Sequence, residues 1–339
     1  KFMPAIAAWV RLLLPAAVRG LTLLTARIGS AHARAPTPAC MSSRATPIFD
    51  SHLHVWSDGN APYPYAVEPP AELREAATTE VFLALAKEAG VAGALVVQPA
   101  NHKYDHAYVA DALRKAGGFL KGMCLANPTL SPEEAVAELT RLHAQGFVGV
   151  RFNPYLFSQP DGMDSDVGRA LYRRAGELAM PVGVMAFGGL PAQLPAIRAL
   201  LAHSPSTLLI VDHMGFFRQP ASGGLLGANA TNDDEAFEGL LSLAQFPQVY
   251  VKVSALFRLS AELAPHRDLQ ARLGRLLDAF GARRLMWGSD FPFVTVGLAA
   301  VEYKQAVEIV SFWNMPELDA NAYELLMGGT AARLFGFKA

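Results

Sequence analysis

The sequence of 339 residues predicts one α/β domain, a single (β/α)8 barrel of the TIM type. Three observations support this fold class. Eight short apolar runs alternate with amphipathic stretches, no low-complexity linker divides them, and polar side chains follow most of the runs. The hydrophobic fraction of 52% is sufficient for one large core.

The apolar runs are the expected strands. Most are rich in Val, Leu or Ile and lack an internal Pro, which is typical of parallel strands buried on both faces. In chain order they are Ile48–His54, Ala92–Gln98, Leu120–Ala126, Phe147–Phe152, Pro181–Phe187, Thr207–His213, Gln248–Ser254 and Arg284–Asp290. An open, doubly wound sheet is the alternative, but it favours a Gly-rich loop after the first strand, where this chain has histidines.

The amphipathic stretches between the runs predict covering helices. The clearest begins after Ser131, where an N-cap residue, a Pro and two acids precede a helix that extends to His143. Further helices are expected at Asp166–Met180, Pro195–His203, Asp233–Ala244, Leu269–Phe280 and Glu302–Phe312. Two irregular stretches, Ser57–Pro70 and Arg218–Asn232, are expected to cover the mouth of the barrel.

Residues 1–46 differ in composition from the rest of the chain. They contain no Asp or Glu, and arginines interrupt their Ala- and Leu-rich runs. This pattern predicts a leader, either an organelle transit peptide or a disordered extension, ahead of a barrel domain at 47–339. A secretory signal and an upstream extension before a start at Met41 are the alternatives. A transmembrane helix is not expected, because the arginines cut each apolar run far below about 20 residues.

Charge and cysteine content argue against several classes of function. The formal net charge of -1 argues against binding to nucleic acid or to a membrane surface. The 2 cysteines predict neither a disulfide framework nor a cysteine zinc site. A small-molecule substrate is therefore expected.

The polar side chains that follow the strands are the candidate site. Barrel enzymes have their active sites at the carboxyl ends of the strands, so these groups are expected to converge there. In chain order they are His52 and His54, Gln98 and His102, Arg151 and Asn153, Asp212 and His213, Lys252 and Ser254, and Ser289 and Asp290. Singly, each has a structural alternative: a buried histidine for His213, a helix cap for Asp290, and structural ion pairs for Arg151 and Lys252.

Four motifs resemble the amidohydrolase-related branch of the amidohydrolase superfamily, which includes lactonases and has decarboxylases as close relatives. The motifs are Asp50–Trp56, Val150–Asn153, Val211–Gly215 and Trp287–Pro292, and the likeness extends from about Ile48 to Phe335. The variants Gln98–Lys103 and Asn153–Tyr155 look like plant and algal members. Together with the leader, they predict a plastid (chloroplast) location, with mitochondrion or cytoplasm as alternatives.

The resemblance implies an amidohydrolase-like barrel that hydrolyses a small carboxylate-bearing lactone or related ester. It implies that Asp290 is the general base. His52, His54 and His213 would be catalytic as electrophiles, or would hold one divalent metal, zinc, together with Asp290. A metal-free site is the alternative, because the fifth strand ends in Val184–Gly188 without a histidine.

Six residues are expected to contact the substrate, and an anionic group would pair with the cations among them: Arg151, Gln98, His102, Tyr155, Lys252 and Arg258. A homodimer is expected from the resemblance. Two other functions remain open from the sequence: a metal-dependent decarboxylase on the same barrel, and a non-catalytic protein that binds a small acid.

Overall fold

A computed structural model describes residues 47–219, 231–232, 234–296 and 300–338. The predicted leader at 1–46 and most of the predicted covering loop Arg218–Asn232 lie outside the described residues, so both stay predictions. Within the described part of the chain, no helix is long and apolar enough to cross a membrane.

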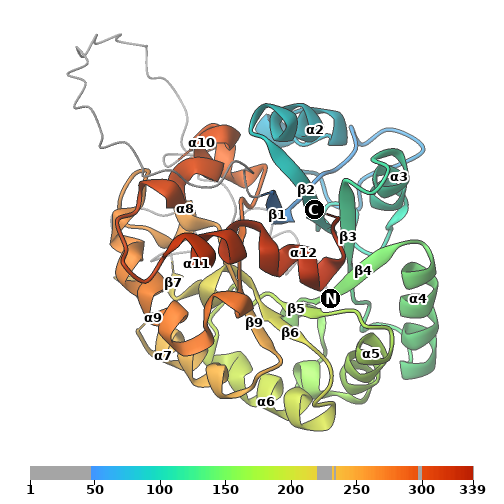
Figure 1. Ribbon diagram of the computed structural model, residues 1–339. Helices are drawn as coiled ribbons and strands as arrows, with labels where there is room; N and C mark the ends of the chain where they lie inside the picture. The colour runs from blue at the N-terminus through green and yellow to red at the C-terminus, as the bar shows by residue number, and fades with distance from the viewer. Residues whose placement is uncertain (1–46, 220–230, 233, 297–299, 339) are drawn as a thin grey trace.

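The predicted barrel is confirmed by an 8-stranded parallel sheet in the order β1-β2-β3-β4-β5-β6-β9-β10 (Figure 1). Each of the eight strands of this sheet overlaps one of the expected apolar runs. The strands are β1 (Ile48–Leu53), β2 (Val91–Val97), β3 (Leu120–Leu125), β4 (Phe147–Phe152), β5 (Val182–Val184), β6 (Leu209–Val211), β9 (Val249–Ser254) and β10 (Leu285–Gly288). A short antiparallel pair, β7 (Arg218–Gln219) and β8 (Thr231–Asn232), lies between β6 and β9 in the chain.

Helices surround the barrel, as Figure 1 shows. The helix after Ser131 is confirmed, and Ser131 and Glu134 form a capping box at its start. The α-helices are α2 (Thr79–Glu88), α3 (Ala107–Lys115), α4 (Pro132–Ala144), α5 (Asp166–Glu177), α6 (Leu194–His203), α7 (Asp234–Ser242), α8 (Leu256–Leu259), α9 (Gln270–Phe280), α10 (Tyr303–Glu308), α11 (Ala320–Glu324) and α12 (Thr330–Phe335). Among these helices, the sequence did not predict α2, α3, α8, α11 and α12.

The amino end of the barrel is filled with apolar side chains. Phe49 of β1 packs in one buried cluster with residues of β2, β3, β6 and β10. The C-terminal segment completes this cluster, because Phe335 belongs to it and Phe337 stacks on Phe49 with ring centroids 4.8 Å apart. Figure 1 shows α11 and α12 lying across the barrel. We therefore expect a ligand to enter from the opposite, carboxyl end of the strands.

The barrel closes where the chain segment after β10 meets β1. The backbone N–H of Asp290 donates to the carbonyl of His52 (2.8 Å), and that of His54 donates to the carbonyl of Phe291 (2.7 Å). The buried Asp50 side chain accepts from the Ser289 backbone N–H (2.9 Å) and contacts the Ser289 hydroxyl (2.6 Å). This seam places the first-strand histidines beside Asp290.

We expect Gly288→Ala to open this seam. A Cβ on Gly288 would lie 2.9 Å from both the Cβ and the backbone N of His52, so β1 would have to move. Crowding of this kind costs about 1–3 kcal/mol, and we expect urea unfolding followed by circular dichroism to show that loss in the free energy of unfolding.

Gly274→Ala on α9 is the matched control, because the nearest atom to its new Cβ is the flexible end of Met315 at 3.8 Å. Replacing a helix-interior Gly with Ala is stabilising by roughly 0.5–1 kcal/mol where space allows. Equal effects of the two substitutions would contradict the tight closure at Gly288.

Candidate active site

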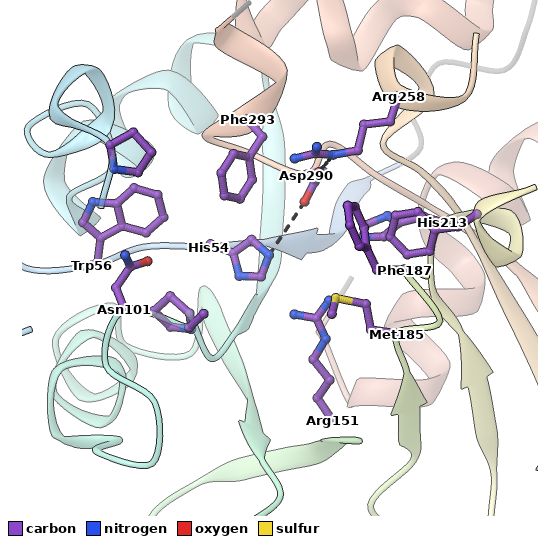
Figure 2. A pocket seen from close by; sticks show the side chains of 14 residues that line it. His54, Trp56, Asn101, Arg151, Met185, Phe187, His213, Arg258, Asp290 and Phe293 are labelled. Atoms are coloured by element: carbon purple, nitrogen blue, oxygen red, sulfur yellow. Dashed lines mark hydrogen bonds and ion pairs between the residues drawn. The ribbon is translucent and has the colours of Figure 1, made fainter. Parts of the chain in front are cut away.

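The carboxyl ends of the strands open into one pocket whose floor is polar and whose walls are mostly apolar (Figure 2). Five of the predicted polar side chains line it: His54, Arg151, His213, Arg258 and Asp290. The walls are largely aromatic or sulfur-containing, from Trp56, Met185, Phe187, Phe216 and Phe293.

Asp290 is the carboxyl group at the centre of the pocket. It follows β10 with a left-handed backbone (φ 62°), and its Oδ2 accepts from Arg258 Nε at 3.0 Å. Burial raises the pKa of Asp290 to about 6, although the nearby charge of Arg258 and then that of Arg151 oppose the rise. A carboxyl with a pKa close to neutrality suits a general base.

His54 is a neutral imidazole whose ring orientation is fixed. Its Nδ1–H donates to the carbonyl of Val97 (2.8 Å), which leaves Nε2 without a proton and 3.7 Å from Asp290 Oδ1. Figure 2 shows this approach. Burial, assisted by the charge of Arg151, lowers the pKa of His54 to about 3. The Nε2 of His54 and the carboxylate of Asp290 are therefore two proton acceptors that lie close together in the pocket.

His213 and His52 lie side by side, with ring centroids 4.3 Å apart. The backbone of His213 is left-handed (φ 51°), and its Nδ1 lies 2.8 Å from the Ser254 hydroxyl. The Nε2 of His52 lies 3.9 Å from Asp290 Oδ1 and is buried with no hydrogen-bond partner. Burial lowers the pKa of both histidines well below the usual value, so both are neutral.

Below the pocket, the carboxylate of Asp212 lies among three nitrogen groups. Arg151 Nε is 3.4 Å from Oδ2, Lys252 Nζ is 3.3 Å from Oδ1, and His52 Nδ1 is 3.5 Å from Oδ1. Burial alone would raise the pKa of Asp212, but the charges of Lys252 and Arg151 outweigh burial and lower it. Asp212 is therefore an ionised, structural counter-charge.

The six predicted substrate contacts fall into three groups. Arg151 and Arg258 line the pocket, whereas Lys252 is completely buried beneath it.

Three others hold loops in place. Gln98 donates to the carbonyls of Lys103 (3.1 Å) and Asp105 (2.8 Å), His102 accepts from the Ser57 N–H (3.2 Å), and Tyr155 accepts from the Gly188 N–H. None of the three is a lining residue of the pocket, and their contact with substrate stays a prediction.

Three of the four predicted metal ligands come together. Among the described residues, His52, His213 and Asp290 could hold a metal ion, with their ligand atoms within 4.8 Å of one another. Three N and O donors suit a catalytic zinc site. However, Lys252 Nζ lies 3.1 Å from His52 Nδ1, and Arg258 pairs with Asp290. Two of the three groups therefore already lie beside a positive side chain, which would repel a metal ion. The donor set fits zinc in type, but the surrounding charge does not.

A family model described as amidohydrolase matches residues 49–337. The chain belongs to this family. A 2-pyrone-4,6-dicarboxylate hydrolase of Comamonas testosteroni is 30% identical over 252 residues, which are 72% of this chain and 76% of that protein. An L-fucono-1,5-lactonase of Burkholderia multivorans is 35% identical over 152 residues, 42% of this chain and 48% of that relative, so the match spans about half of its length.

The solved structure of a putative 2-pyrone-4,6-dicarboxylic acid hydrolase from Pseudomonas putida is also similar. It has a TM-score of 0.68 and 27% identity, and the match covers 87% of this chain and 100% of that one. These relatives confirm the prediction of a lactonase-like enzyme of the amidohydrolase superfamily. The predicted transit peptide, location and dimer stay predictions.

The sequence analysis missed the pocket walls and the role of Asp212. Trp56 and Phe293 read as ordinary core residues, because apolar side chains near strand ends are usually buried in packing. A signal for Asp212 was present: Arg151 and Lys252 lie on strands expected to be buried, and buried cations need an anion.

We expect Arg258→Met to raise the pKa of Asp290 above its present value of about 6, because the guanidinium favours the ionised carboxyl. Titration of the Asp290 carboxyl by carbon-13 NMR, assigned with Asp290→Asn, measures the shift. Arg114→Met is the control, because Arg114 is exposed on α3 and pairs with Asp111 instead. An unchanged midpoint in Arg258→Met would show that this ion pair does not tune Asp290.

Proposed function

We propose that the protein hydrolyses a small, carboxylate-bearing lactone by adding water to the ring carbonyl. The observation that carries the proposal is Asp290, a buried carboxyl with a pKa of about 6 that shares one pocket with two guanidinium groups. The lactone hydrolases among the relatives support the same reaction class.

Asp290 would take the proton of the attacking water. A correctly placed base contributes on the order of 10²–10⁴ in rate. The unprotonated Nε2 of His54 faces Asp290 and would accept the second hydrogen of the same water, which orients its oxygen toward the carbonyl. When the ring C–O bond breaks, the protonated Asp290 would return its proton to the leaving oxygen.

The guanidinium groups of Arg151 and Arg258 would bind the substrate carboxylate. Each uses Nε on a protein carboxylate, Asp212 for Arg151 and Asp290 for Arg258, so the terminal nitrogens are available to a ligand. A forked guanidinium binds a carboxylate with two parallel hydrogen bonds. Both residues line the pocket, on either side of His54 and Asp290 (Figure 2).

The apolar walls favour a flat, unsaturated lactone over a polyhydroxylated one. Trp56, Phe187 and Phe293 offer ring faces and edges, and Asn101 is the one uncharged amide among the lining residues that the structure describes. Each hydroxyl of a sugar lactone would need a polar partner that these walls lack. A zinc ion held by His52, His213 and Asp290 would polarise the carbonyl when bound. The steps above need only the protein side chains.

We expect Asp290→Asn to abolish hydrolysis of 2-pyrone-4,6-dicarboxylate, followed by ultraviolet absorbance, because an amide cannot accept the proton. In the unchanged protein, kcat/KM should rise with pH through an apparent pKa of about 6, since only the ionised Asp290 is a base.

Circular dichroism of Asp290→Asn controls for folding. Turnover by the Asn variant would refute Asp290 as the base. Release of carbon dioxide in place of ring opening would favour the decarboxylase instead.

We expect Arg151→Lys to raise KM for 2-pyrone-4,6-dicarboxylate by about 10- to 100-fold, the value of a charge-assisted bond, because lysine keeps the charge but loses the fork. Steady-state kinetics measures the change. The dimethyl ester of the same pyrone, which has no carboxylate, should show little change in KM. Arg141→Lys is the control, because Arg141 is an exposed residue of α4 paired with Glu138. Equal changes in KM for the dicarboxylate and its dimethyl ester would show that Arg151 does not bind the substrate carboxylate.

A further inference from the structure

Lys252 is a fully buried lysine on β9 that does not line the pocket, although its ammonium lies directly beneath His52. We propose that Lys252 is a positioning residue that fixes the tautomer of His52, so that His52 carries its proton on Nε2 and donates a hydrogen bond beside Asp290. The inference rests on the proposed hydrolysis only for the use of that hydrogen bond, not for the tautomer itself.

The hydrogen bond between Lys252 and His52 can have only Lys252 as its donor. Lys252 Nζ lies 3.1 Å from His52 Nδ1, within hydrogen-bond distance. A lysine ammonium has three donor hydrogens and no acceptor, so Nδ1 must be the acceptor. A neutral imidazole has one N–H, and an accepting Nδ1 puts that hydrogen on Nε2.

The rival for Nδ1 is the carboxylate of Asp212, which would require the opposite tautomer. Its Oδ1 is 3.5 Å from Nδ1, longer than the contact with Lys252 and beyond a good hydrogen bond. The same carboxylate is already the counter-charge of Lys252 (3.3 Å) and Arg151 (3.4 Å). Lys252 is therefore the better partner for His52.

His52 cannot avoid the choice by carrying both protons. A second proton would place a third cation in the buried space that already holds Lys252 and Arg151, against the carboxylate of Asp212, while the nearby Asp290 already pairs with Arg258. Like charges without solvent repel strongly. His52 therefore carries one ring proton, on either Nδ1 or Nε2. The position of that proton decides whether Nε2 donates or accepts a hydrogen bond.

The proton position decides between two kinds of chemistry. Nε2 is buried, has no hydrogen-bond partner and lies 3.9 Å from Asp290 Oδ1. With a proton, it is a preformed donor for the oxyanion that develops next to the base. Without one, it is a lone pair that can ligate zinc with His213 and Asp290. Lys252 thus favours a protonated Nε2 on His52. A protonated Nε2 has no lone pair with which to ligate zinc.

The test is nitrogen-15 NMR of the full chain with labelled histidine, where protonated and unprotonated ring nitrogens resonate far apart. The His52 signals are assigned by their loss in His52→Gln. We expect a proton on Nε2 and none on Nδ1. The opposite pattern would overturn the inference. No substrate is required, so a failure of the proposed hydrolysis would leave this result standing.

Lys252→Met provides the second measurement. With the ammonium gone, we expect the His52 proton to move to Nδ1, toward Asp212, and kcat to fall by about 10²–10³-fold with little change in KM. Zinc affinity, measured by calorimetric titration of zinc alone, should rise by at least about tenfold, because Nε2 gains a lone pair and one cation is lost. A lysine that only supports the fold would leave the His52 tautomer unchanged, so the tautomer is the deciding readout.

Lys121→Met on β3 is the matched control, the same change on another barrel strand, and it should alter neither the tautomer nor zinc affinity. An unchanged tautomer in Lys252→Met would also overturn the inference. If Lys252→Met does not fold, the spectrum of the unchanged protein decides alone.

Discussion

The carboxylate of Asp212 holds together a buried group of charges on which the site depends. Arg151 of β4, Lys252 of β9 and His52 of β1 all approach this one side chain within 3.5 Å. Removing one partner of a buried ion pair typically costs about 3–5 kcal/mol, because the remaining charge is left without compensation. The network thus ties three strands to one another, and it fixes the positions of Arg151, which lines the pocket, and of His52, which is buried beside it.

The two carboxylates at this end of the barrel have opposite properties because their neighbours differ. Both are buried, but Asp212 has two close cations that keep its pKa low, whereas burial dominates at Asp290 and raises its pKa to about 6. Environments that separate the pKa values of neighbouring acids assign them separate roles. Asp212 stays ionised and positions other groups, while Asp290 can exchange a proton near neutral pH.

The two ends of the barrel are also different in kind. Apolar packing, including the C-terminal Phe335 and Phe337, fills the amino end. The carboxyl end contains the charges, and most of them are buried. Electrostatic interactions are stronger between buried groups than in solution. Filling one end with core therefore concentrates the chemistry at the other.

The sequence was enough to predict the alternation of strands and helices, because buried parallel strands need continuous apolar runs and these runs were distinct. It also determined which side chains end the strands, since Asp290 and the histidines follow the runs directly. The helices α8 and α11 were missed because, at 4 and 5 residues, they are too short to show helical periodicity. That reason does not apply to α2 and α3, which are as long as the expected α6 and α7.

The separate roles of those side chains could not be predicted from the sequence and became visible in the folded chain. Lys252 and Arg151 are both cations on strands, yet one lies beneath the floor and the other lines the pocket. Gln98 donates to two loop carbonyls, a contact that the sequence did not indicate, while its predicted contact with substrate stays a prediction. The reason is physical: strand periodicity specifies a face, whereas distance, burial and the charge of neighbours from distant strands depend on how the barrel closes.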